Sequence, residues 1–117
     1  MAVQRFEDLL VWQKSQDLAV AVYSSFTSCK DFAFRDQITR ASVSVSNNIA
    51  EGFERSSNAD FSRFLYISLG SISEVRSMLY LAVRLHLLTS SDFEKINQQS
   101  NEISKMLYGL INSMKKK

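Results

Sequence analysis

The chain has 117 residues, a mass of 13.3 kDa and a formal net charge of +2, with 45% hydrophobic residues. This is the length of one domain, and the hydrophobic fraction is too high for a chain that stays disordered. It has no proline and three glycines, which excludes a turn-rich β-barrel or sandwich and the glycine-rich loops that cradle phosphates.

Cysteine usage and hydropathy indicate the compartment. One cysteine, Cys29, excludes an intramolecular disulfide and suits a reducing environment. The N-terminus lacks a signal-peptide pattern, and no apolar run reaches the ~20 residues that a membrane span needs. We therefore expect a cytoplasmic protein with no membrane contact.

The first two predicted helices cover residues 8–26 and 34–55, where apolar residues recur at spacings of three and four. The second has a centre of small and polar residues, so packing must hold it and a neighbouring helix can come close. Asp31 is placed to cap its N-terminus. The apolar face expected for the first helix consists of Leu9, Trp12, Ala19, Tyr23 and Phe26, widened by Val11, Leu18 and Val22.

The third and fourth predicted helices cover residues 59–87 and 91–114. Ser57 with Asp60, and Ser91 with the glutamate three residues later, have the spacing of capping boxes. Four long helices with short connections predict an all-α fold, an antiparallel up-down-up-down four-helix bundle that forms a single domain over the whole chain.

The end of the third predicted helix, residues 78–88, is apolar on nearly all sides. A helix of this kind is normally buried all round, which a lone four-helix bundle does not allow. We therefore expect a homo-oligomer that forms through outer apolar residues of the first and third helices, with a long loop or the N-terminal arm covering this surface as the alternative. The candidate interface residues are Tyr66, Ile67, Tyr80 and Val83.

Few residues suggest catalytic or metal chemistry. Di-iron bundles use Glu-x-x-His pairs, and neither Glu51 nor Glu74 is followed by histidine at that spacing. Cys29, His86 and Asp31 have the residue types of a nucleophilic triad, but nothing in the sequence brings them together. We predict no enzyme activity, no metal and no cofactor, and interpret His86 as a packing or capping residue.

Basic residues suggest a polyanionic partner, RNA or DNA, although acidic residues are interspersed among them. The candidate phosphate-binding residues are Arg55 and Arg63, at the connection between the second and third helices, and the C-terminal Lys115, Lys116 and Lys117. We expect these two clusters at opposite ends of the bundle, so that at most one of them binds. We favour the arginines, because helices anchor them.

Polar residues also recur on the facing sides of the middle helices. Asn48 and Glu51 are three residues apart on one helix, and Ser71 and Glu74 are three apart on the next. We expect them to join in one buried or interfacial polar network that specifies which helices pair, rather than in a catalytic site.

Three blocks of the sequence carry a family resemblance: FEDLLVWQK at residues 6–14, DQITRASVSV followed by NIAEG within residues 36–52, and RFLYISLGS with a later glutamate at residues 63–74. Together they resemble the bacterial four-helix-bundle family encoded by intervening sequences within 23S ribosomal RNA genes, sometimes labelled ribosomal-protein-like. The resemblance implies a homo-oligomer, a pentamer, with no known catalytic activity.

At the level of fold the chain is also similar to the accessory protein of diversity-generating retroelements, a basic pentameric bundle that engages nucleic acid and a reverse transcriptase. The function that these observations favour is a non-enzymatic homo-oligomeric bundle with RNA, DNA or a nucleic-acid enzyme as its partner. An oligomeric protein-interaction scaffold without nucleic-acid contact is the alternative.

Overall fold

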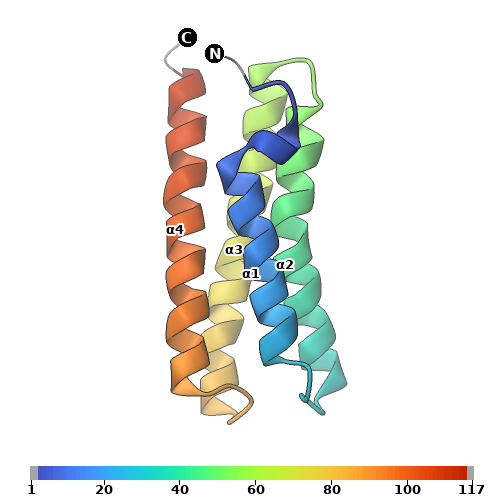
Figure 1. Cartoon of the computed structure of the whole chain (residues 1–117), viewed down its shortest axis with the longest axis vertical. Coiled ribbons are helices and arrows are strands. Elements are labelled where there is room, and N and C mark those ends of the chain that lie inside the picture. The colour runs from blue at the N-terminus through green and yellow to red at the C-terminus, as the bar shows by residue number, and fades with distance from the viewer. Residues whose placement is uncertain (1–2, 116–117) are drawn as a thin grey trace.

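The structure is a computed structural model that describes residues 3–115. These residues form four α-helices, preceded by one short 3₁₀ helix, and no β-strand: η1 (Phe6–Asp8), α1 (Leu10–Ser25), α2 (Phe32–Phe53), α3 (Asn58–Arg84) and α4 (Ser90–Lys115). The helices run alternately in opposite directions along the bundle axis (Figure 1). The predicted fold class is confirmed, and the predicted helix limits agree to within three residues.

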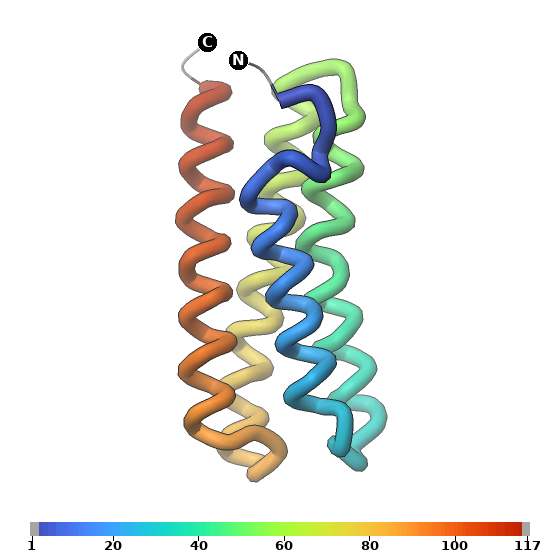
Figure 2. The backbone as a smooth tube through the Cα atoms, in the orientation of Figure 1, coloured from blue at the N-terminus to red at the C-terminus, as the bar shows by residue number. Residues whose placement is uncertain are grey.

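The four helices stand side by side in a bundle that measures 46 × 20 × 20 Å. Each packs against two neighbours: α1 contacts α2 and α4, and α3 contacts α2 and α4. The first residues of α1, the α2–α3 connection and the last turn of α4 lie at one end of the bundle, and the other two connections lie at the opposite end (Figure 2). All four helices supply fully buried side chains to one core, among them Leu18, Val22, Ile38, Val45, Ile49, Leu65, Ile72, Leu79, Ile96, Ile103 and Leu107.

The buried face of α1 contains most of the expected residues, with Tyr23 as the exception. The core receives Val11, Leu18 and Val22, whereas Tyr23 is 54% exposed. Two sets of apolar residues on this helix have helical spacing, and a serine lies on the face that is buried. The Ser15 hydroxyl donates a 2.7 Å hydrogen bond to the Val11 carbonyl, which allows this polar residue to lie in the core. The prediction is therefore confirmed for Val11, Leu18, Val22 and Phe26, and it is wrong for Tyr23.

The N-termini of α2 and α3 have the predicted caps. The Asp31 carboxylate accepts a 3.1 Å hydrogen bond from the Phe34 N–H, and the Ser57 hydroxyl accepts one of the same length from the Asp60 N–H. Each bond satisfies a backbone donor that has no partner within the helix. Both predictions are confirmed.

The predicted cap of α4 is wrong. The helix begins at Ser90, and its capping bond runs from the Asp92 N–H to the Thr89 hydroxyl, at 3.1 Å. Ser91 lies inside the first turn instead. Thr89 and Asp92 have the same three-residue spacing as the pair proposed from the sequence, so local pattern did not distinguish the two starts.

The C-terminus of α3 ends in a left-handed residue. His86 has a φ of 61°, its N–H donates to the Val83 carbonyl at 3.1 Å, and the Leu87 N–H donates to the Ala82 carbonyl at 2.8 Å. These two bonds form the helix-ending motif in which glycine usually takes the left-handed position. The interpretation of His86 as a capping residue is confirmed.

Small residues bring α2 and α3 close together, as the sequence of α2 predicted. A Cβ atom added to Gly52 would lie 2.7 Å from the Cβ of Phe64. Further along the same pair of helices, the buried Ser68 hydroxyl donates a 2.8 Å hydrogen bond to the Val45 carbonyl. The close approach of these two helices positions the residues of the sites described next.

Candidate nucleic-acid interface

Three of the candidate phosphate-binding residues lie towards the same end of the bundle. Arg55 lies in the α2–α3 connection, Arg63 near the start of α3 and Lys115 at the end of α4 (Figure 1). The expectation that they lie at opposite ends is wrong, because α2 and α4 run in the same direction and so end together. Lys116 and Lys117 lie outside the described residues. We call Arg55, Arg63 and Lys115 the basic end.

The two arginines of the basic end share one aromatic ring. The guanidinium carbon of Arg55 lies 4.8 Å from the centroid of Phe64, and that of Arg63 lies 4.6 Å from it. Each arginine also has a carboxylate neighbour, with Glu51 at 3.0 Å from Arg55 and Asp60 at 3.6 Å from Arg63. The ring holds both cations in place, while the carboxylates offset part of their charge.

Lys115 contacts a tyrosine rather than a carboxylate. Its Nζ donates a 3.3 Å hydrogen bond to the Tyr66 hydroxyl, and it makes no ion pair among residues 3–115. Tyr66 was placed on the oligomer surface from the sequence, and nothing in the sequence connects it with a residue 49 positions away. The contact joins α3 to α4 at the basic end.

A serine at the centre of α2 joins two members of the expected polar network. The Asn48 side-chain amide donates to the Ser44 carbonyl at 2.8 Å and to the Ser44 hydroxyl at 3.0 Å. The same hydroxyl lies 2.8 Å from the hydroxyl of Ser71 on α3. Sequence reasoning missed Ser44, although its position one turn before Asn48 was the available signal.

The two carboxylates of that expected network lie outside this cluster. Glu51 is exposed and pairs with Arg55, and Glu74 is exposed and accepts a 3.2 Å hydrogen bond from the Gln37 amide. Within one chain the four residues therefore do not form a single network. Side chains at three-residue spacing share a face only approximately, so Glu51 turns away from the side that Asn48 presents to α3.

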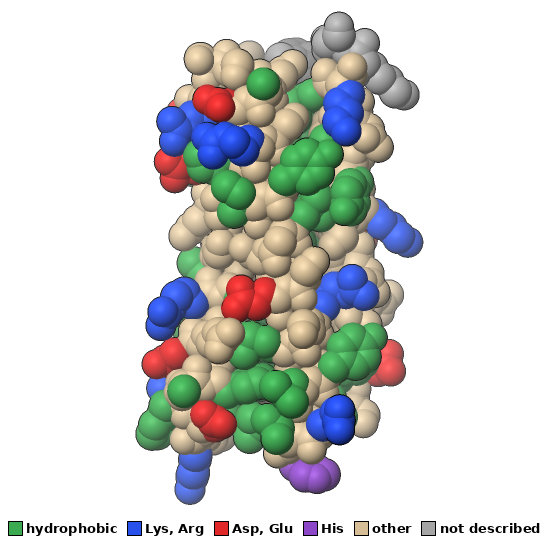
Figure 3. All heavy atoms as spheres, turned by 180° about the vertical axis from the view of Figure 1, so that it is seen from behind, with side chains coloured by type: hydrophobic (Ala, Val, Ile, Leu, Met, Phe, Trp, Pro, Cys, Tyr) green, Lys and Arg blue, Asp and Glu red, His purple; other side chains and the backbone are tan. Residues whose placement is uncertain are grey.

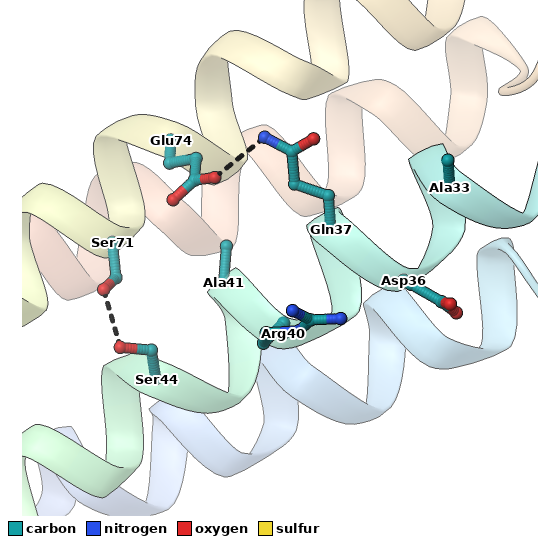
Figure 4. Close-up of a pocket in the computed structure, with 8 residues that line it drawn as sticks. All are labelled: Ala33, Asp36, Gln37, Arg40, Ala41, Ser44, Ser71 and Glu74. Carbon is teal, nitrogen blue, oxygen red and sulfur yellow. Dashed lines mark hydrogen bonds between the residues drawn. The ribbon is translucent and has the colours of Figure 1, made fainter.

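Glu74 and the serine pair line an open groove between α2 and α3, with a volume of about 620 Å³. Figure 4 shows Ser44 facing Ser71 and Gln37 facing Glu74 across this groove. Each serine hydroxyl has the other as a partner, and no histidine or cysteine lines the groove to act as a base or a nucleophile. The lining consists of Ala33, Asp36, Gln37, Arg40, Ala41, Ser44, Ser71 and Glu74.

Residues 3–115 contain neither a cluster of metal-binding side chains nor a helix suited to span a membrane. No group of three or more histidine, cysteine, aspartate or glutamate side chains in this part of the chain is arranged to hold a metal ion. None of its helices combines the length and the apolar character that crossing a bilayer requires.

The outer side of α3 carries exposed hydrophobic side chains. Ile67 is 43% exposed, Tyr80 54% and Leu81 46%, and hydrophobic and charged side chains alternate over this side of the molecule (Figure 3). Val83 is only half-buried and packs against the core, so it contributes less to this surface than the sequence suggested. Because η1 packs against α1 and α2, it does not cover this surface.

Comparison with known proteins identifies relatives of the chain. A sequence profile described as "23S rRNA-intervening sequence protein" matches residues 7–109. A crystal structure of a protein with unknown function from the S23 ribosomal protein family of Bacteroides thetaiotaomicron is 34% identical, with a TM-score of 0.82 over 87% of this chain and 98% of that one. A search of curated proteins found no match. The first two findings confirm the resemblance carried by the three sequence blocks.

Proposed function

This chain belongs to the 23S rRNA-intervening sequence protein family, and within that family we propose for it a non-enzymatic role, as a self-associating helical bundle that binds nucleic acid through its basic end. The observation that carries the proposal is that Arg55, Arg63 and Lys115 all lie towards the same end of the bundle. A polyanion reaching that end encounters cations from the α2–α3 connection, α3 and α4 together.

The groove between α2 and α3 supports a role without catalysis. Its serine hydroxyls bond to each other, and the single histidine, His86, ends α3 without a side-chain hydrogen bond to a hydroxyl or thiol among residues 3–115. A nucleophilic mechanism needs a nucleophile and a base within hydrogen-bond reach. The groove of the described residues does not contain that arrangement, which is consistent with a role in binding.

Self-association is supported by the exposed hydrophobic side chains of α3. We define the α3 face as Ile67, Tyr80 and Leu81 of α3 together with Leu85, the residue that follows the helix; these side chains are between 43% and 54% exposed. Covering such side chains contributes roughly 25 cal/mol for each Å² of apolar surface removed from water, which favours contact with a second copy. For the pentamer that the family resemblance implies, five copies at +2 each carry +10 in total, so repeated basic ends reinforce one another's potential.

The ion pairs at the basic end leave room for a phosphate. Both arginines and both carboxylates are 43% to 59% exposed, and exposed pairs of this kind contribute at most about 1 kcal/mol. An arginine has several N–H donors and can contact a phosphate while one donor faces a carboxylate. Lys115 adds a cation with no carboxylate neighbour among residues 3–115.

Light scattering at micromolar concentration tests self-association. We expect a mass several times the 13.3 kDa of one chain, and we expect Tyr80→Glu to reduce it while circular dichroism shows the helices intact. Tyr23→Glu is the matched control, because Tyr23 on α1 is also 54% exposed. A monomeric mass for the unmodified chain contradicts the proposal. If only Tyr23→Glu dissociates the assembly, the interface lies on α1 instead.

A salt titration tests nucleic-acid binding, with fluorescence anisotropy of labelled RNA and DNA between about 50 and 200 mM salt. We expect binding to weaken steeply with salt, and Arg55→Ala with Arg63→Ala to reduce both the affinity and the salt slope. Arg40→Ala is the control, because Arg40 lies in the groove and makes no ion pair among residues 3–115.

The same titration separates this role from that of a protein-interaction scaffold. The acidic neighbours Glu51 and Asp60 favour the scaffold, because they lower the positive charge of the basic end. A parent protein that shows no salt-sensitive binding to RNA or DNA refutes the nucleic-acid role and leaves the scaffold. An equal loss in the Arg40 control places binding elsewhere on the bundle.

A further inference from the structure

We propose that the basic end prefers single-stranded nucleic acid to a duplex, because Tyr66 offers its ring as a stacking surface for an unpaired base; this inference rests on the proposed function. Proteins that bind single strands without sequence preference combine cations along the backbone with aromatic rings under the bases. At the basic end of this bundle, exposed aromatic side chains lie among the cations.

Tyr66 is partly exposed, and the Lys115 ammonium group does not cover its ring. The residue is 45% exposed, and its one contact with a cation involves the hydroxyl. The Lys115 Nζ lies 3.3 Å from the hydroxyl oxygen but 5.9 Å from the ring centroid, so the ammonium group is at the hydroxyl edge rather than over the ring. The lysine therefore orients the ring and leaves its face open to a base.

Cations lie on two sides of this ring. Lys115 approaches from α4, and Arg63 lies three residues before Tyr66 on the same side of α3, held over the Phe64 ring at 4.6 Å. A nucleotide strand stacked on Tyr66 can thus place phosphates near a cation on either side of the stacked base. Figure 3 shows Lys and Arg side chains beside hydrophobic ones near this end of the molecule.

A second tyrosine lies at the same height on the neighbouring helix. Tyr80 of α3 packs edge-to-face on Phe93 of α4, with ring centroids 4.9 Å apart, which aligns the two antiparallel helices. Tyr66 is fourteen residues before Tyr80, and Tyr108 is fifteen after Phe93, so at about 1.5 Å per residue they are level. Tyr108 is 51% exposed and lies two turns before Lys115, so a second base can stack beside the first.

This arrangement favours an unpaired strand for a physical reason. In a duplex the faces of the bases are stacked on each other, so an exposed tyrosine gains nothing beyond the contacts that the cations make with phosphates. In a single strand each base has an accessible face, and stacking on an aromatic ring changes the dissociation constant by about tenfold per base. Stacking is equally open to RNA and DNA.

Fluorescence anisotropy with the full chain tests the inference, using labelled oligouridine, labelled oligothymidine and RNA and DNA duplexes, all of about 20 units. We expect either single strand to bind about tenfold more tightly than the matching duplex. Tyr66→Ala is expected to remove most of that preference and to leave duplex binding and the salt slope unchanged, because stacking releases no counterions. Tyr66→Phe is expected to keep the preference.

The control is Tyr23→Ala, because Tyr23 is 54% exposed and lies near the opposite end of the bundle, towards the end of α1. Equal affinity for single strands and duplexes, with Tyr66→Ala neutral, overturns the inference and leaves the proposed function intact. A parent that binds no oligonucleotide refutes the proposed function itself.

Two further results overturn the stacking role specifically. A loss in Tyr66→Phe as large as in Tyr66→Ala assigns the effect to the hydroxyl and its contact with Lys115. A lower mass of Tyr66→Ala in light scattering assigns Tyr66 to self-association. Comparison of the oligouridine and oligothymidine arms then shows whether the bound strand is RNA or DNA.

Discussion

Replacement of glycine by alanine is expected to have opposite effects on the stability of the protein at different positions. Replacing Gly52, Gly70 or Gly109 with alanine makes the same chemical change at a helical position. A Cβ at Gly52 would lie 2.7 Å from the Phe64 Cβ and 3.0 Å from a ring carbon of Phe61, whereas nothing lies within 4 Å of a Cβ at either of the other two. We expect Gly52→Ala to destabilise the protein and Gly109→Ala to stabilise it.

The magnitude follows from two opposing effects. In a helix interior alanine is favoured over glycine by about 1 kcal/mol, and Gly52 gains no more than this because it lies in the last turn of α2. The clash at Gly52 involves a Cβ attached to the backbone of α3, so the helices themselves must move, and overpacking of this kind costs about 1–3 kcal/mol. The difference between Gly52→Ala and Gly109→Ala is therefore about 1–3 kcal/mol, because the helix-propensity effect largely cancels.

Urea unfolding followed by circular dichroism measures the difference directly. For a domain of this size, 1 kcal/mol corresponds to about 4 °C in Tm, so thermal unfolding gives an independent estimate. Gly70→Ala is a second reference for Gly109→Ala, because an added Cβ has no atom within 4 Å at either position. If Gly52→Ala and Gly109→Ala stabilise the protein equally, the argument that close α2–α3 packing requires glycine at position 52 is refuted.

Two further predictions concern helix ends. His86→Gly is expected to raise the free energy of unfolding by about 1 kcal/mol, because it removes the cost of a left-handed residue at a φ of 61°, and His86→Ala is the control that should show no gain. Thr89→Ala is expected to lower it by about 1 kcal/mol through loss of the α4 cap, with Ser91→Ala nearly neutral. If urea unfolding shows that Ser91→Ala lowers the free energy of unfolding more than Thr89→Ala does, Ser91 rather than Thr89 caps α4.

Much of the fold was predictable because it depends on local interactions. The number of helices follows from apolar spacing, and the caps at Asp31 and Ser57 follow from side chains that bond to backbone N–H groups a few residues away. The errors arose where two local patterns competed, as for Thr89 and Ser91 at the start of α4. On α1 the apolar spacing also included Tyr23, which is exposed, and it did not indicate that Ser15 lies in the core.

The candidate site depended less on local pattern. The sequence identified Arg55, Arg63 and Lys115 as chemically suited to phosphate, but placed them at opposite ends. Their common end follows from the alternating helix directions, since α2 and α4 run the same way (Figure 1). The Phe64 ring beneath both arginines and the Lys115–Tyr66 contact could not be predicted, because each depends on side chains that only tertiary packing brings together.

The sequence by itself determined the helices, the residue types of the basic end and the family, because apolar spacing, capping residues and the three sequence blocks are all properties of neighbouring residues. Tertiary structure alone decided which glycine lies against a neighbouring helix and how the polar residues of α2 and α3 pair. Gly52, Gly70 and Gly109 look equivalent in the sequence, yet only Gly52 faces another helix at contact distance. Distances between helices depend on every side chain in the core at once, so no local pattern specifies them.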